Sequence, residues 1–369
     1  MNKLVIAAVV LLAFSACVGH KTTEKPLEST ANMDGLGYVW MMPKSGSFIE
    51  LLDNDKLDQW QETLAAIDII GYADHVLFGS RDEDMRLIPY PREVHEAVFE
   101  VMNQIGLPLA LEVGAVKPWG RTGLSAFTQQ NNSFWKNFIE RGATIAGIVM
   151  DEPLSAVFNR YDTHFADLIP ENTPEAKFEY AIEETAYFMQ LVREEYPDWF
   201  IACIGVYPNF DADETILWID ALEARLAEKG VRGQEFFRLD VDWNAFGKNY
   251  TNALGQRRYI SWERGWSEVK RIEDHCRSIG LPFSLVYWAA DVAASPVLRA
   301  DPASWLNSIL QMGQRYQNAG GRPDQYVIQT WIPNIPEKTL PETDPHSFTY
   351  SVVEFNKQII PPYPHGGDQ

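Results

Sequence analysis

Short apolar segments recur along the chain, and a longer segment with helical spacing of apolar residues separates most neighbouring pairs. Eight have the length and composition of buried strands: Gly37–Met42, His75–Ser80, Pro108–Gly114, Ile145–Asp151, Phe200–Val206, Phe236–Asp242, Pro282–Trp288 and Gln325–Trp331. The helical segments are Lys56–Ile70, Arg92–Ile105, Asn132–Arg141, Pro174–Glu195, Asp213–Lys229, Trp266–Ile279 and Ala303–Ala319. Strands that alternate with helices pair in parallel. The pattern therefore predicts an α/β protein with a single (β/α)8 TIM barrel over residues 35–345.

Helix-boundary signals support these ranges. Thr173 followed by Pro174 and Glu175 predicts a helix start, and Gly106 and Gly280 each follow a helical segment shortly before a strand. No Gly-x-Gly-x-x-Gly follows the first strand, so the pattern does not favour a dinucleotide-binding sheet.

The N-terminus has the pattern of an export signal. Lys3 precedes an apolar run from Leu4 to Phe14, which is too short to span a bilayer. Residues 14–17, Phe-Ser-Ala-Cys, resemble the lipobox of bacterial lipoproteins; an ordinary cleaved signal peptide is the alternative. The resemblance implies a signal peptide over residues 1–16, lipidation of Cys17 and export to the periplasmic or cell-surface face of the membrane, the outer membrane in a Gram-negative cell. The lipid would be the only membrane anchor.

Polar residues 17–34 suit a tether, and residues 346–369 form a C-terminal extension. The formal net charge of −20 would repel phosphate backbones and disfavours nucleic-acid binding. Apart from Cys17, the cleaved chain has two cysteines, Cys203 in a predicted strand and Cys276 in a predicted helix. This placement predicts two buried thiols and no disulfide.

Charged residues fall on predicted inward faces. In Phe236–Asp242, strand alternation turns Leu239 and Val241 toward the helices, which leaves three inward residues: Arg238, Asp240 and Asp242. The same alternation turns Glu112 inward, and Asp151 and Glu152 end the fourth strand. Long polar loops, Asp151–Thr173 and Asn244–Gly265, follow the fourth and sixth strands, on the face where barrels build active sites.

Most of these acidic residues have a possible structural role as an alternative to a catalytic one. Asp240 and Arg238 would form a buried ion pair, Asp151 would cap a turn, and Glu112 would act as a partner of Lys117. Glu152 has no evident packing role, because it ends a strand beside another acid and precedes a proline.

Several tryptophans lie at strand ends, where flat rings suit stacking on sugars. The alternative is that several of them fill the barrel top. The predicted substrate-binding residues are Glu112, Lys117, Trp119, Trp40, Asp240, Trp243, Tyr207, Trp288, Gln329 and Trp331.

Glu152-Pro153 at the end of the fourth strand resembles the Asn-Glu-Pro signature of clan A glycoside hydrolases, whose Glu is the acid/base. The resemblance implies that Glu152 is the acid/base of an enzyme that cleaves a poly- or oligosaccharide with paired carboxylates and no cofactor. Asp151 stands where the signature has Asn, and the seventh strand lacks the Glu that the clan uses as nucleophile. The second carboxylate is therefore open: Asp242 or Asp240 from the sixth strand, or Asp291 after the seventh. The predicted catalytic set is Glu152, Asp242, Asp291 and Asp151.

Other reaction classes have weaker sequence support. The seven histidines are scattered, so we expect no metal site, although Glu112, Asp151 and Asp240 leave a magnesium site as an alternative. A Schiff-base enzyme would depend on Lys117, and no Gly-x-Ser-x-Gly motif is present. The main rival is a glycan-binding surface lipoprotein on a barrel that has lost catalysis.

Overall fold

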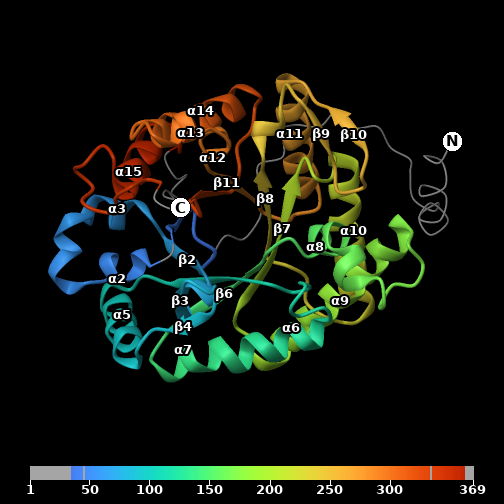
Figure 1. Ribbon diagram of the computed structural model, residues 1–369, viewed down its shortest axis with the longest axis horizontal. Helices are drawn as coiled ribbons and strands as arrows, with labels where there is room; N and C mark the ends of the chain where they lie inside the picture. The colour runs from blue at the N-terminus through green and yellow to red at the C-terminus, as the bar shows by residue number, and fades with distance from the viewer. Residues whose placement is uncertain (1–34, 45, 333–334, 362–369) are drawn as a thin grey trace, which may run out of the picture.

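Eight parallel strands close into a barrel in the computed structural model, which describes residues 35–44, 46–332 and 335–361 (Figure 1). In barrel order they are β1 (Val39–Met42), β2 (Ile69–Ala73), β5 (Leu109–Val113), β6 (Ile145–Met150), β7 (Phe200–Tyr207), β8 (Phe236–Val241), β11 (Phe283–Tyr287) and β12 (Gln325–Gln329). β12 pairs with β1 in parallel and closes the ring. The predicted single TIM barrel is confirmed.

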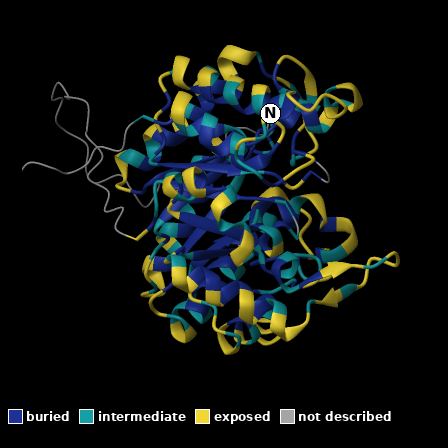
Figure 2. Cartoon of the chain, turned by 90° about the vertical axis from the view of Figure 1, so that its left-hand side faces the viewer, coloured by how far each residue is buried: buried dark blue, intermediate teal, exposed yellow. Residues whose placement is uncertain are grey.

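Helices surround the strands. They are α2 (Ser47–Leu51), α3 (Gln61–Ala66), α4 (Asp74–Phe78), α5 (Arg92–Ile105), α6 (Gly123–Gln130), α7 (Lys136–Glu140), α8 (Pro153–Asn159), α9 (Pro174–Glu195), α10 (Ala212–Glu228), α11 (Trp262–Ser278), α12 (Ala290–Ala294), α13 (Pro296–Arg299), α14 (Ser304–Asn318) and α15 (Phe348–Gln358). Buried residues concentrate in the strands and on the helix faces that cover them, while exposed residues lie on the outside (Figure 2). α15 packs on the barrel through Phe355, whose ring centroid lies 4.7 Å from that of Tyr287.

Local sequence signals set several of these boundaries. α5 and α9 have the predicted bounds; the Thr173 side chain caps α9 and Pro174 occupies its first turn. Gly106 follows α5 as its C-terminal cap, and its φ of 67° is the left-handed geometry that glycine adopts without strain. None of the helices in the described ranges is long and apolar enough to cross a membrane.

The second strand differs from the prediction. It begins at Ile69, whereas the predicted strand His75–Ser80 lies in α4 and the start of the β3 (Gly79–Arg81) and β4 (Leu87–Pro89) hairpin. Ile69, Ile70 and Tyr72 are buried on both faces of β2, so this run lacks the alternation that marks a half-exposed strand. The predicted helix Lys56–Ile70 is correspondingly shorter: a 3-10 turn at Asn54–Gln59 and then α3.

Both long loops contain structure of their own. α8 and the short π-helix Tyr161–Phe165 lie between β6 and α9. A 3-10 turn (Trp243–Ala245) and the hairpin of β9 (Asn249–Thr251) and β10 (Arg257–Tyr259) follow β8. Cys203 and Cys276 are buried free thiols, as predicted. The predicted signal peptide, Cys17 and the tether lie outside the described residues.

The barrel interior is layered. Trp40 of β1 packs against Phe200 of β7 and Phe236 of β8, with ring centroids 5.5 Å and 5.7 Å away. The Arg238 guanidinium lies 4.1 Å from the Trp40 ring centroid, one inward position further along β8 than Phe236. The interior is therefore filled by aromatic rings and a cation, and the polar mouth begins above them.

Candidate active site

Glu112 projects inward from β5. Its neighbours Leu111 and Val113 are buried on the helix side, and its carboxylate accepts a hydrogen bond of 3.1 Å from Gln329 Nε2 of β12. Strand alternation thus brings together two residues that are 217 positions apart in the sequence. Both keep partial solvent exposure.

Lys117 reaches the end of β6 from the loop after β5. Its Nζ donates to Asp151 Oδ2 at 2.6 Å, and only 17% of its side chain is exposed. A Cβ atom at Gly114 would lie 2.6 Å from Lys117 Cγ and 2.7 Å from Trp119 Cζ2, so the loop requires a glycine here. The Gln130 side chain bonds both the N–H and the C=O of Gly114 and fixes its backbone.

Glu152 joins β6 to α8 in a left-handed backbone conformation, with φ 43° and ψ 52°. A glutamate rarely adopts this conformation, and such strain occurs preferentially at functional sites. Pro153 follows at the first helical position and fixes the direction in which the chain leaves the barrel.

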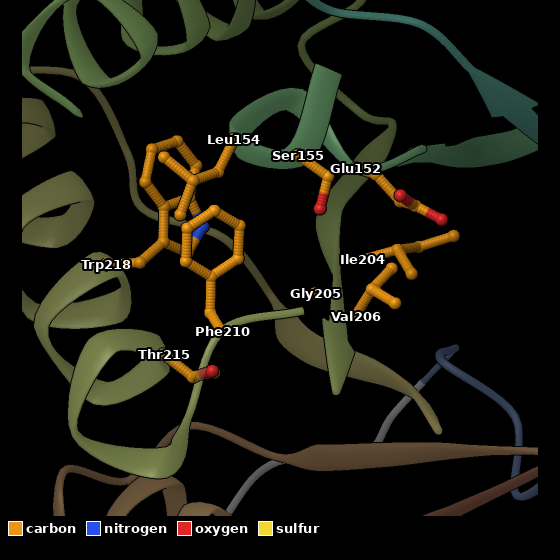
Figure 3. A pocket seen from close by; sticks show the side chains of 9 residues that line it. All are labelled: Glu152, Leu154, Ser155, Ile204, Gly205, Val206, Phe210, Thr215 and Trp218. Carbon is orange, nitrogen blue, oxygen red and sulfur yellow. The ribbon is translucent and has the colours of Figure 1, made fainter. Parts of the chain in front are cut away.

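A small hollow lies beside Glu152, between α8, β7 and α10. Apolar side chains line most of it, including Leu154, Phe210 and Trp218. In Figure 3 the Glu152 carboxylate points away from these side chains and lies on the side of Ile204. Glu152 is therefore backed by an apolar wall, which removes solvent from one side of its carboxyl group.

β8 supplies the inward residues Arg238, Asp240 and Asp242, the last directly after the strand. Arg238 is fully buried; its Nε donates to Ser284 Oγ at 3.1 Å and its Nη1 lies 3.5 Å from Met42 Sδ. Asp240 occupies the next inward position. Among the described residues Arg238 and Asp240 form no ion pair, so the structural alternative considered for them is not what the geometry shows.

The carboxyl groups of Glu112, Asp151, Glu152 and Asp240, here called the acidic cluster, affect one another electrostatically. Burial, followed by the charge of Asp151, raises the pKa of both Glu112 and Glu152 to about 7. Burial also raises the pKa of Asp240 well above its usual range, with Glu152 adding to the effect. Near neutral pH the cluster therefore holds both protonated and ionised carboxyl groups.

Two charged residues beside the acidic cluster, Asp242 and Arg238, also have shifted pKa values. Burial raises the pKa of Asp242, while the backbone N–H of Asn244 opposes that rise. Burial lowers the pKa of Arg238 to about 9, and Glu112 opposes that fall.

Aromatic rings lie at the mouth. The ring centroids of Trp288 and Trp331 are 4.4 Å apart at an interplanar angle of 40°, and Trp331 is 45% exposed. Trp119, on the loop that carries Lys117, is 48% exposed. Trp119 and Trp331 are therefore open to a ligand at the strand ends, whereas Trp288 is buried at 9% exposure and supports Trp331.

Two predicted substrate-binding tryptophans lie elsewhere. Trp40 is fully buried beneath Arg238, and its Nε1 donates to the Leu36 carbonyl. Trp243 is buried and donates to the Trp288 carbonyl at 3.1 Å, so it supports that tryptophan from behind.

Two other predicted residues face away from the acidic cluster. The Tyr207 hydroxyl donates to Glu268 of α11 at 2.9 Å, on the helix side of β7. Asp291 accepts hydrogen bonds from Ser308 Oγ and from the Val292 N–H at the start of α12. The structure thus joins Asp291 to α14 and does not bring it to Glu152.

Ser284 is not among the site residues predicted from the sequence, and Arg238 is there only a possible ion-pair partner of Asp240. Alternation carried a signal for both, because Phe283, Leu285 and Tyr287 face the helices and leave Ser284 inward. In the described ranges, no three His, Cys, Asp or Glu residues are arranged to hold a metal ion. Glu112, Asp151 and Asp240, the residues considered for a magnesium site, are therefore not arranged to hold a metal ion.

No protein-family model and no curated protein matches the chain. Similar solved structures include Haloferax volcanii malate synthase, at 12% identity over 89% of this chain and 75% of the other, with a TM-score of 0.42. The carboxyl transferase domain of Rhizobium etli pyruvate carboxylase is 12% identical over 88% of this chain and 50% of the other, with a TM-score of 0.42. The Thermoanaerobacterium saccharolyticum intracellular xylanase TsXylA is 10% identical over 84% of this chain and 90% of the other, with a TM-score of 0.41. The barrel assignment itself follows from the parallel strand pairing.

Proposed function

We propose that this chain is a glycoside hydrolase in which Glu152 donates a proton to the glycosidic oxygen. The observation that carries the proposal is the position of this one carboxyl group, at the end of a barrel strand and against an apolar wall. Glu152 is held in a strained conformation at the end of a barrel strand, where burial and Asp151 raise its pKa to about 7. A general acid must hold its proton near the working pH and release it to the departing group.

The second carboxylate of the mechanism would be Asp242. It follows the inward positions of β8 and interacts electrostatically with Asp240, a member of the acidic cluster. Asp291, another of the three candidates, accepts hydrogen bonds from Ser308 and from the backbone at the start of α12. Asp242 would act as nucleophile or as base toward water; the separation of the two carboxyl groups decides which.

Lys117 and the mouth tryptophans would perform the remaining tasks. The ion pair of 2.6 Å holds Asp151 beside Glu152, so that its negative charge opposes early loss of the proton. The exposed rings of Trp119 and Trp331 would stack on sugar rings, which have apolar faces, and Trp288 would support Trp331. Lipid attachment at Cys17 would place this activity on the exported side of the membrane.

A carbohydrate panel tests the proposal. The full chain is incubated with neutral and charged poly- and oligosaccharides, and the release of new reducing ends is measured. We expect turnover of at least one glycan, with a loss of about 10²-fold or more in Glu152→Gln and no loss of glycan binding. Glu175→Gln, an exposed residue of α9, is the matched control.

Retention on a glycan without release of reducing ends would instead support the rival function, a glycan-binding surface lipoprotein. Turnover that is equal in the wild type and in Glu152→Gln would remove Glu152 from the mechanism.

A further inference from the structure

Two polar atoms at the base of the barrel mouth have no hydrogen-bond partner within the described part of the chain. They are Nη2 of Arg238 and Oδ1 of Asp240, each with almost no solvent contact. Buried polar atoms in folded proteins nearly always have a partner, because a missing one costs stability. The two atoms therefore indicate a place where an external group completes the site.

Arg238 forms the floor of the mouth. The guanidinium lies 4.1 Å from the Trp40 ring centroid. Its Nε donates to Ser284 Oγ and its Nη1 donates to Met42 Sδ. Fully buried and held from three directions, the side chain has little freedom to turn its remaining donor elsewhere. Glu112, a member of the acidic cluster, interacts electrostatically with the Arg238 guanidinium and raises its pKa against the larger effect of burial.

Asp240 forms the adjacent wall. It occupies the next inward position on β8, about 6.6 Å further along the strand by ordinary strand geometry, and keeps partial exposure to the mouth. The negative charges of Glu152, Asp242 and Glu112 each raise the pKa of Asp240 further.

We propose that Arg238 and Asp240 together bind one hydroxyl group of an uncharged sugar unit, the unit whose linkage Glu152 would protonate; the inference rests on the function proposed above. A hydroxyl oxygen accepts from Arg238 Nη2 while its proton is donated to Asp240 Oδ1. One neutral group thus satisfies both unpartnered atoms.

Charged sugars fit this pair less well. The carboxylate of a uronic acid would suit Arg238 but would lie among Glu112, Asp151 and Glu152. The ammonium of an amino sugar would suit those acids but would approach the Arg238 cation. Only a group that is both donor and acceptor, without net charge, avoids a repulsive neighbour.

The first experiment measures binding of monosaccharides to the full chain by isothermal titration calorimetry. The neutral probes are glucose, galactose, mannose and xylose; galacturonate and glucosamine are the charged probes. We expect a neutral sugar to bind most tightly, and one monodeoxy form of that sugar to bind about tenfold more weakly or worse. Tighter binding of either charged sugar, or no binding of any neutral sugar, would overturn the inference.

The second experiment separates hydrogen bonding from charge. Asp240→Ala removes the acceptor and should weaken binding of the best neutral sugar about tenfold or more, whereas Asp240→Asn keeps an oxygen acceptor and should stay within about threefold of wild type. Glu273→Gln is the matched control, because Glu273 is a fully buried carboxyl between α11 and α14, away from the mouth. Equal affinities in Ala and wild type, or equal losses in Ala and Asn, would refute the role of Asp240. If Asp240→Ala does not fold, the Asn variant and the deoxy sugars still decide.

The two proposals fail in different ways. Glycan turnover that requires Glu152 but is indifferent to Asp240→Ala would reject the hydroxyl site and keep the hydrolase. Sugar binding that requires Asp240, without turnover of any glycan, would reject the hydrolase and keep the binding site.

Discussion

Substitution of Glu152 by glutamine should change how the stability of the protein depends on pH. The pKa of Glu152 is raised from 4.5 to about 7 in the folded chain. The folded state therefore holds this proton more tightly than the unfolded state does. The resulting stability is complete below about pH 4.5 and is lost as the pH rises through about 7. Glutamine does not titrate, so the variant lacks this loss.

The size of the effect follows from the pKa difference. A change from 4.5 to about 7 spans about 2.5 pH units, and each unit corresponds to about 1.36 kcal/mol. The upper limit is therefore about 3 kcal/mol above neutral pH. Because Glu112 titrates in the same range and interacts with Glu152, we expect about 1–3 kcal/mol. For a chain of this size that corresponds to a Tm difference of a few degrees.

The assay is thermal unfolding of wild type, Glu152→Gln and the surface control Glu175→Gln at about pH 5.5 and about pH 8. The Tm of Glu152→Gln relative to wild type should rise by a few degrees between the two pH values, while that of Glu175→Gln should not change. The same Tm difference between Glu152→Gln and wild type at both pH values would show that Glu152 does not hold its proton through neutrality. The case for it as general acid would then fail as well.

Two other changes test the mouth of the barrel. Gly114→Ala would place a Cβ 2.6 Å from Lys117 Cγ and 2.7 Å from Trp119 Cζ2, so we expect turnover to fall about tenfold or more while the protein stays folded; unchanged kcat/KM would show that the loop position is unimportant. Trp331→Ala should weaken glycan binding about tenfold without lowering Tm by more than about 2 °C, because the ring is 45% exposed and packs mainly on Trp288. A larger fall in Tm with unchanged glycan affinity would make Trp331 a packing residue.

The barrel could be predicted from the sequence because most of its strands are short apolar runs bounded by helix signals. β6, β7, β8 and β12 begin at the predicted residues, and each ends within two residues of its predicted end. β2 could not be found in this way, because Ile69, Ile70 and Tyr72 are all buried and follow a helical segment without a break. Whether such a run ends a helix or forms a strand depends on its neighbours in the barrel, which the local pattern does not contain.

The inward faces of the site could also be predicted, because alternation is a local property of a strand. It gave Glu112 and Asp240 their orientation, and the structure joins both to Asp151 and Glu152 in one acidic cluster. Alternation does not show depth. Trp40 and Arg238 share the inward direction with the predicted site residues but lie at the bottom of the barrel, in contact with each other.

The backbone strain at Glu152 and the burial of several acids have the same consequence for the folded chain. A left-handed glutamate and several buried acids each lower the stability of the folded chain, by about 1–3 kcal/mol for the backbone strain alone. The Lys117–Asp151 ion pair offsets only part of the charge, because Lys117 is the one cation that lies within bonding distance of an acid in the acidic cluster, among the described residues. A barrel selected for stability alone would pair these acids or replace them with apolar residues. That they remain, only partly compensated and at the end of the strands where barrels carry out chemistry, favours a site whose missing contacts are made by a substrate.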